Sequence, residues 1–323
     1  MGDRDRTPAN TDEADIHDGV TRRHLIVGGV AVTGAIGVGS GLLGQDEDIE
    51  PTPADRLTTA ETQFTGVATT LTETDVANPH SSWDLRNKIE TALNSVNQIL
   101  SEDFPDEPEI QQRINALRTT TEYYSTLVTS LTAADSLFGS VSDSEPNVLK
   151  QTGDLNYDPA SKLDSSSFEQ SLGQLATAEK APSEVTSEGR TLVPDQQAVL
   201  DALRTQREIF DRHIRAQQSY LDSATPIEVG VRAHEQSRFA DARANLTVAQ
   251  EALLPNISGT SGAYLLSNHG LTLDQYREVF SLRQDGVAQL LDAIQETVPE
   301  DERQSAVNSA LNAFFEARNL LPR

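Results

Sequence analysis

The sequence predicts an all-α protein of antiparallel helices. Hydrophobic residues recur every three or four positions along most of the chain, which is the spacing of one helix face. Two segments, 272–275 (TLDQ) and 299–302 (PEDE), have the composition of helix starts. No run of useful length alternates hydrophobic and polar residues, as a strand would. We therefore expect an antiparallel bundle, or a short array of helical hairpins, after an N-terminal signal or anchor helix.

The N-terminal part of the chain has three segments of different composition. Residues 1–24 are polar and charged, which is typical of a disordered leader. Residues 25–44 carry no charge and are long enough to span a bilayer as a helix. Their seven glycines weaken such a helix by roughly 1 kcal/mol each relative to alanine. The acidic, proline-containing segment 45–53 then forms a spacer.

A pair of arginines directly precedes the apolar run. The pattern Ser/Thr-Arg-Arg-x-hydrophobic-hydrophobic is matched by Thr21, Arg22, Arg23, Leu25 and Ile26. Val27 stands where a lysine is common. With the polar leader, these residues resemble a twin-arginine translocation (Tat) signal, which implies the Tat translocase as the partner during export. The alternative is a plain signal anchor, in which the arginines only set the orientation.

Both interpretations predict the same topology. Arg22 and Arg23 keep the leader in the cytoplasm, and the helices lie on the outer side of the membrane. Gly39 and Gly41 are small enough to precede a cleavage site, but no Ala-x-Ala is present. We therefore expect an extracytoplasmic protein anchored in the membrane by residues 25–44; cleavage of the signal would make it a secreted protein.

The composition is strongly acidic and poor in lysine. The chain has 50 acidic and 25 basic residues, a formal net charge of −25 and no cysteine. Its lysines are Lys88, Lys150, Lys162 and Lys180. This composition resembles that of haloarchaeal proteins, whose self-repulsion is screened by concentrated salt. The alternative is an ordinary acidic protein with a basic partner. Nucleic acid is not expected as a partner, because phosphate binding needs clustered lysine and arginine.

The chain after the spacer divides into three regions. Residues 54–140 form an N-terminal helical region whose last part has a heptad-like hydrophobic seam. Residues 141–191 are rich in Ser, Asp, Pro and Gly, and we expect a loop-rich connection with one short helix around Leu172. Residues 192–323 form a C-terminal helical region.

Two proline-containing segments predict helix starts in the C-terminal region. Pro194 is suited to a first helical turn. Segment 225–228 (TPIE) combines a capping box with a proline near the first position. We therefore expect one helix to begin near residue 194 and another near residue 226.

Segment 230–255 resembles a tetratricopeptide repeat (TPR), a hairpin of two helices. The matching positions are Gly230, Phe239, Ala242, Leu246 and Ala249; Ala233 stands where the repeat has an aromatic residue, and Pro255 is one residue later than its closing proline. Small residues let the two helices approach closely, and bulky residues fill the space between them. A weaker match to the second helix of the repeat occurs at Ala310, Phe314, Ala317 and Pro322. The alternative is generic packing of antiparallel helices.

The histidines carry no recognisable metal-binding or catalytic pattern. His213 and His234 fall in expected helices, next to Asp211 and Glu235 in sequence. Neither forms the Glu-x-x-His or His-Glu-x-x-His spacing of a di-iron or zinc site. We therefore expect no metal, no cofactor and no catalytic residue, and we expect these two histidines to lie at the surface or to pack in the interior.

Two sequons are possible glycosylation sites on an exported chain. Asn256 begins Asn-Ile-Ser directly after Pro255, at the expected end of a helix. Asn245 begins Asn-Leu-Thr inside an expected helix and is the poorer acceptor.

The sequence favours a non-enzymatic helical scaffold on the outer face of a halophilic cell, which binds a protein or peptide partner. The alternative is an extracytoplasmic solute-binding or sensory bundle with a small-molecule pocket. A closed pocket with convergent polar side chains would favour the bundle. A groove on the outer surface would favour the scaffold.

Overall fold

The computed structural model describes residues 50–150, 165–178, 181, 186, 189–253, 264–266, 270–295 and 298–321. This part of the chain is all-α and without strands, which confirms the predicted fold class. The chain divides into two units, 1–49 and 50–323. The leader, the twin arginine, the run 25–44 and nearly all of the spacer lie outside the described residues. Within the described ranges, no helix has a stretch long and apolar enough to cross a bilayer.

The N-terminal helices are α1 (Pro53–Glu73), α2 (Ser82–Leu100) and α3 (Pro108–Lys150), with a short 3₁₀ turn at Pro79–Ser81 before α2. A capping box starts α1: the Asp55 amide donates to the Thr52 hydroxyl at 3.2 Å, and the Thr52 amide donates to the Asp55 carboxylate at 3.0 Å. The reciprocal bonds satisfy two amides that the helix itself leaves unpaired.

The expected boundary at residue 140 is wrong, because α3 continues to Lys150. Its last turns lie in the interior: the side chains of Val141, Val148 and Leu149 are buried. Burial of these residues stabilises helix in a segment whose Ser, Asp and Pro content is typical of a loop. The short helix α5 (Ser166–Thr177) lies where the sequence predicted one.

Helix α6 (Gln196–Glu235) begins two residues after Pro194, with Asp195 as its N-cap. It runs through Pro226 without ending, so the helix start predicted at 225–228 is wrong. A proline inside a helix costs about 3 kcal/mol, because it removes one backbone hydrogen bond and its ring crowds the preceding turn. Here the helix buries Ser223 before the proline and Ala233 after it. This burial on both sides offsets the cost.

Three further helices follow in the described part of the chain: α7 (Phe239–Ala252), α8 (Leu273–Ala293) and α9 (Glu300–Asn319). The capping box predicted at Thr272 and Gln275 is present, and the acidic start predicted for the last helix is confirmed. Helix α7 packs against α6, and α9 packs against α8, so each pair forms a hairpin.

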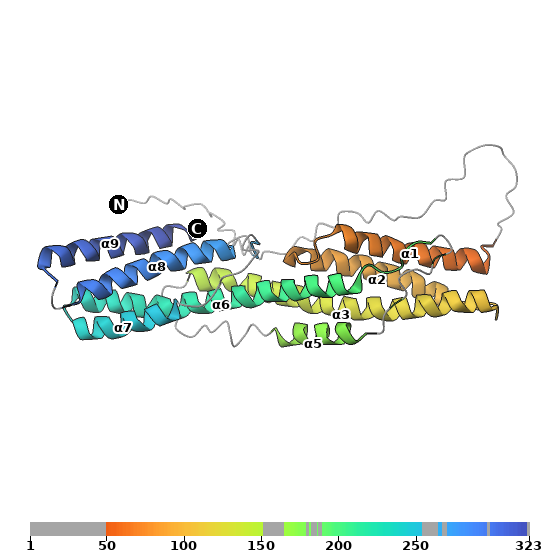
Figure 1. Ribbon diagram of the computed structural model, residues 1–323, viewed down its shortest axis with the longest axis horizontal. Coiled ribbons are helices and arrows are strands. Elements are labelled where there is room, and N and C mark those ends of the chain that lie inside the picture. The colour runs from red at the N-terminus through yellow and green to blue at the C-terminus, as the bar shows by residue number, and fades with distance from the viewer. Residues whose placement is uncertain are drawn as a thin grey trace, which may run out of the picture. The chain divides into compact units, whose positions relative to one another are not determined.

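Among the described residues, two hydrophobic clusters fill the interior. The first packs α1, α2 and α5 with most of α3 and the first half of α6. The second packs α7, α8 and α9 with the rest of α6 and the end of α3. Helices α3 and α6 lie side by side and contribute to both clusters (Figure 1). On α6, Ile214 belongs to the first cluster and Ala216 to the second.

Candidate functional site

A layer of buried polar side chains lies where the two hydrophobic clusters meet. We call it the polar layer; its members are Ser144, Glu145, His213 and Gln217. The first two come from the end of α3 and the other two from the middle of α6. Each has at most 5% of its surface exposed. Polar groups this deep are costly unless they are hydrogen-bonded, so their partners decide what the layer does.

Gln217 joins α6 to α3. Its Oε1 accepts a hydrogen bond of 2.6 Å from the Ser144 hydroxyl, and its Nε2 donates to the Val141 carbonyl at 3.3 Å. The amide therefore uses both its acceptor and its donor on the neighbouring helix. These bonds fix how the two long helices lie against each other.

Glu145 connects α3 to the start of α8. Its carboxylate accepts a hydrogen bond of 3.1 Å from the backbone amide of Leu271, two residues before the helix begins. Burial, followed by the nearby Glu145 carboxylate, raises the pKa of the Tyr276 phenol well above its usual value. Tyr276 therefore stays protonated, and its hydroxyl remains a neutral group beside the carboxylate.

His213 is the one histidine of the polar layer. Its ring meets the Tyr276 ring edge-on, with 6.2 Å between the centroids and an angle of 84° between the planes. Among the described residues, none makes a hydrogen bond of good geometry with either ring nitrogen. Burial lowers the pKa of His213 to about 3, and the Tyr264 backbone opposes this effect. The ring is therefore neutral at physiological pH.

The polar layer joins the helices, and its side chains are at most 5% exposed. Ser144 and Gln217 bond to each other, and Glu145 bonds to a backbone amide. A catalytic acid or base must reach a substrate atom, and a fully buried side chain reaches none unless the helices separate. The layer therefore links the helices of the two hydrophobic clusters.

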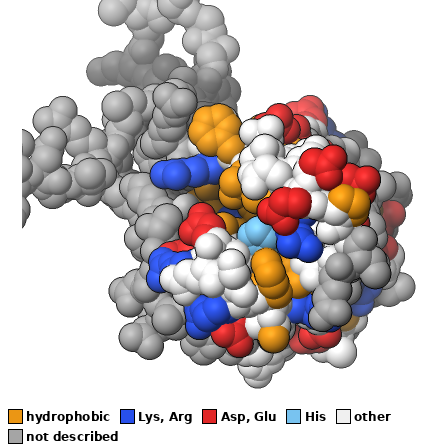
Figure 2. All heavy atoms as spheres, turned by 90° about the vertical axis from the view of Figure 1, so that its left-hand side faces the viewer, with side chains coloured by type: hydrophobic (Ala, Val, Ile, Leu, Met, Phe, Trp, Pro, Cys, Tyr) orange, Lys and Arg blue, Asp and Glu red, His pale blue; other side chains and the backbone are white. Residues whose placement is uncertain are grey.

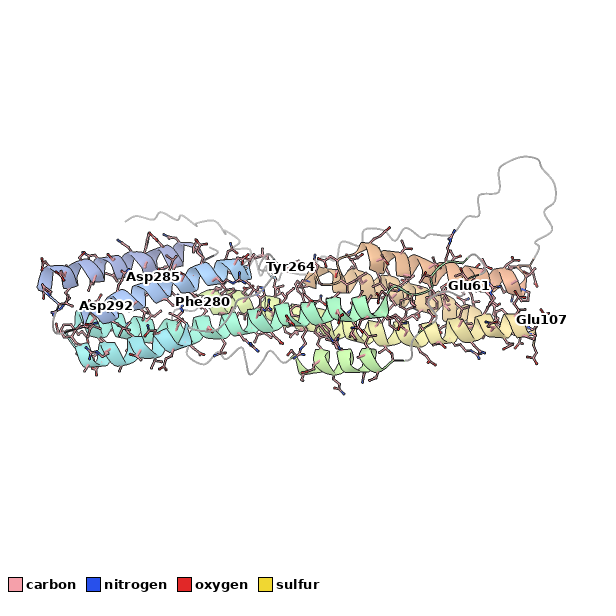
Figure 3. The ribbon with its side chains drawn as sticks, in the orientation of Figure 1. Glu61, Glu107, Tyr264, Phe280, Asp285 and Asp292 are labelled. Atoms are coloured by element: carbon pink, nitrogen blue, oxygen red, sulfur yellow. The ribbon has the colours of Figure 1, made fainter. Side chains whose placement is uncertain are left out.

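A connecting segment, Tyr264–Leu266, fastens the second set of helices to the first. The Tyr264 hydroxyl donates to the Asp75 carboxylate at 2.8 Å, and the His80 Nε2 lies 2.8 Å from the Leu265 carbonyl oxygen. Leu266 is buried in the first cluster. Figure 3 shows Tyr264 near the boundary between the two sets of helices. This segment comes from the α7–α8 connection and contacts the α1–α2 connection.

One concave feature on the described surface is a groove between α3 and α5. It has a volume of about 340 Å³, is open to solvent, and is lined by Ser125, Thr126, Thr129, Gln174, Thr177 and Ala178. None of these side chains carries a charge, although the chain as a whole has a net charge of −25. We call this feature the α3–α5 groove.

The hydroxyl groups of the groove present acceptors to the solvent. The Thr126 hydroxyl donates to the Glu122 carbonyl at 3.0 Å, and the Thr129 hydroxyl donates to the Ser125 carbonyl at 3.1 Å. Thr177 donates in the same way to the Gln174 carbonyl at 3.0 Å. Because each hydroxyl proton is used inside its own helix, the oxygen lone pairs are left for an incoming N–H donor.

His234 lies near the other end of the C-terminal helices. Its ring meets Phe239 edge-on at 5.5 Å, and the Arg303 guanidinium also lies 5.5 Å from the Phe239 centroid. Burial and the Arg303 charge lower the pKa of His234, while Glu235 and Glu300 raise it. Figure 2 looks onto this end, where acidic, basic and hydrophobic side chains are interspersed without a patch of one kind.

Most of the site residues predicted from the sequence lie outside the part of the chain that the structure describes. Arg22, Arg23, Leu25, Ile26 and Asn256 lie outside the described residues. Asn245 lies in α7, as expected, and its Nδ2 donates to the Asp241 carbonyl at 2.8 Å. No group of three His, Asp or Glu side chains that could hold a metal ion occurs within the part of the chain that the structure describes.

The sequence did not point to the groove or to the polar layer. Ser125, Thr126 and Thr129 fall on the polar side of a predicted helix, where such residues are common. The second wall of the groove comes from α5, and nothing in the sequence pairs α5 with that part of α3. Glu145 is one of many acidic residues, and its contact with Leu271 joins positions 126 residues apart.

The described part of the TPR-like segment, 230–253, forms the expected hairpin, and Pro255 lies outside the described residues. Gly230 on α6 faces Leu246 on α7: a methyl group at Gly230 would lie 2.7 Å from the Leu246 Cγ. Ala233, Ala242 and Ala249 are fully buried between the helices. Comparison of the chain with protein-family models, with curated proteins and with solved structures found no match.

Proposed function

We propose that this chain is an exported, membrane-tethered, non-enzymatic helical scaffold that holds a segment of a protein or peptide partner in the α3–α5 groove. The observation that carries the proposal is the shape and lining of this groove. It is open, uncharged and rich in hydrogen-bond acceptors. Export and tethering rest on the sequence, through the twin arginine and the apolar run 25–44.

An open groove suits a chain segment better than a small molecule. Small-molecule sites bury about 70–90% of the ligand surface. The open α3–α5 groove covers only one side of a ligand. A peptide can lie along it with its other side in solvent, without losing contacts that it needs for binding. Backbone N–H groups of an extended segment are donors that match the hydroxyl oxygens of Thr126, Thr129 and Thr177.

The absence of charge on the groove lining fits the same partner. The chain as a whole has a net charge of −25, so a basic ligand would be drawn to acidic side chains elsewhere on it, and an acidic ligand would be repelled. A neutral, polar segment is not repelled and needs no counter-charge in the site. Its binding is therefore expected to persist in concentrated salt, where Coulomb attraction is screened.

A charged side chain in the groove tests the proposal. Thr129→Arg places a long cation between α3 and α5 and should block the segment. Thr62→Arg is the matched control, because Thr62 is also an exposed helical threonine whose hydroxyl donates to its own helix, at 2.8 Å to the Thr58 carbonyl on α1. The measurement is capture of envelope proteins by each tagged full-length chain in concentrated KCl.

We expect the wild type and Thr62→Arg to capture the same partner and Thr129→Arg to lose it. A partner retained equally by all three chains would show that the groove is not its binding site. Capture of nothing by the wild type would count against the scaffold itself.

A further inference from the structure

Arg283 on α8 carries a positive charge to the edge of the second hydrophobic cluster. The residues one turn before and after it on the same side of the helix, Phe280 and Val287, are buried. Its guanidinium carbon lies 3.9 Å from the centre of the Tyr220 ring on α6. Burial lowers the pKa of Arg283, and Tyr220 opposes this effect. A charge in such surroundings loses hydration, so it needs a compensating partner.

The hydrogen bonds of Arg283 go to neutral groups on α6. Its Nη1 donates to the Ser223 hydroxyl at 3.1 Å and to the Tyr220 carbonyl at 3.3 Å. The Ser223 hydroxyl donates its own proton to the same carbonyl at 3.1 Å, so its oxygen is free to accept from the arginine. Both bonds of Arg283 use one nitrogen of a planar group that has five N–H donors, and neither brings a negative charge.

Among the described residues, no carboxylate forms an ion pair with Arg283. The acids nearest in sequence to this contact, Asp222 on α6 and Asp285 on α8, are both exposed. Asp222 accepts a hydrogen bond of 2.7 Å from Gln218 on its own helix. Asp285 lies about 200° around α8 from Arg283, at 100° per residue. The positive charge is therefore not neutralised within the described part of the chain, although the protein has 50 acidic residues.

Arg113 on α3 shows the contrasting arrangement. Its side chain is 14% exposed, and its Nε donates to the buried carboxylate of Glu61 on α1 at 2.7 Å. There the chain itself supplies the negative charge that a poorly hydrated arginine needs. The described residues supply none at Arg283, which points to an anion from solution as the missing partner.

We propose that Arg283, held by Tyr220 and Ser223, binds a small monovalent anion, which is chloride in a chloride-rich medium. Arg283 keeps part of its surface exposed, so an ion from solution can reach the guanidinium. Because the Tyr220 ring covers a face of this group, the anion approaches in its plane, where the N–H bonds point. The bound anion neutralises the charge between α6 and α8 and stabilises their contact. The site depends neither on the α3–α5 groove nor on export.

Bromide is the direct probe, because it replaces chloride and scatters X-rays anomalously. Crystals of the full-length wild type in KBr should show an anomalous peak beside the Arg283 guanidinium. Arg118 is the control within the same crystal: it is an exposed arginine on α3 with no ion pair among the described residues, and it should have no peak. The proposal is overturned by the absence of a peak at Arg283, by equal peaks at both arginines, or by a carboxylate of the chain seated on Arg283.

Stability in solution gives an independent measurement. The wild type, Arg283→Met and Arg118→Met are unfolded with urea in KCl and in potassium gluconate of the same concentration. An anion that binds only the folded chain stabilises it, so chloride at ten times its Kd should lower the unfolding equilibrium constant of the wild type about elevenfold relative to gluconate. Arg118→Met should respond like the wild type, and Arg283→Met should lose this response.

The same response to chloride in all three chains would overturn the proposal, because a general effect of the salt would then explain it. The bromide measurement uses the wild type, so it decides the question even if Arg283→Met does not fold.

Discussion

His213 is neutral because folding removes its ring from water. The ring packs against Tyr276, and burial lowers the pKa of His213 from 6.5 to about 3. The sequence predicted that this histidine lies on a helix, two residues after Asp211, but it did not indicate how deeply the ring is buried. Asp211 lies 3.5 Å from Arg207 on the same helix, while the neighbours of His213 come from α8 and from the Tyr264 segment. Contacts between distant segments have no local sequence pattern.

The lowered pKa predicts a loss of stability in acid. The unfolded chain binds a proton on residue 213 below pH 6.5, and the folded chain does not until the pH approaches 3. The free energy of unfolding should therefore fall with pH across this window, by about 1.4 kcal/mol per unit from this residue. Denaturant unfolding of the wild type and of His213→Phe, at constant salt between pH 7 and 4, measures this contribution.

His213→Phe keeps a ring against Tyr276 and removes the titrating nitrogens. Its unfolding free energy should depend less steeply on pH than that of the wild type. Identical slopes for the two chains would contradict the burial of a neutral histidine in the polar layer.

The helices themselves could largely be predicted, because each has an amphipathic repeat that the sequence displays. The capping box at Thr272 was predicted from residue spacing, and the hairpin, described over 230–253, was implied by the resemblance to a TPR. The errors fall where tertiary burial outweighs local preference. Pro226 lies inside α6, and residues 141–150 extend α3, because both segments contribute buried side chains to the interior. Local propensity is a weak guide where packing supplies the larger energy.

The close approach of α6 and α7 depends on Gly230. Gly230→Ala would place a methyl group 2.7 Å from the Leu246 Cγ, so the helices must separate or Leu246 must change its rotamer. We expect a loss of about 1–3 kcal/mol in the free energy of unfolding. Gly66→Ala in α1 is the control: nothing lies within 4 Å of its added methyl group, and it should gain about 0.5–1 kcal/mol. Chemical denaturation measures the free energy of unfolding of both variants. A Gly230→Ala variant that is more stable than the wild type would contradict the tight α6–α7 contact.

At the scale of the whole molecule, two hydrophobic clusters share α3 and α6 and are joined by the polar layer. The sequence predicted two helical regions with a loop between them. It did not predict that the continuous helices α3 and α6 would each contribute to both clusters. An apolar repeat shows which face of a helix is buried, but not which other helices pack against that face. The groove that we propose as the binding site depends on this arrangement, since α5 packs against α3 and α6 together.

We propose that this helical unit lies outside the cell and holds a partner in the α3–α5 groove. Because the chain has no cysteine, single thiols report on one position each. Intact cells carrying Thr62→Cys or Thr129→Cys can be treated with a maleimide that does not cross membranes, and the labelled fraction measured over time. Both chains are labelled again after purification as a reference.

We predict that Thr62→Cys is labelled in intact cells, and that Thr129→Cys is labelled more slowly until purification removes the partner. Labelling of Thr62→Cys only after the cells are broken would contradict the outer location. Equal labelling rates of the two thiols in intact cells would contradict an occupied groove.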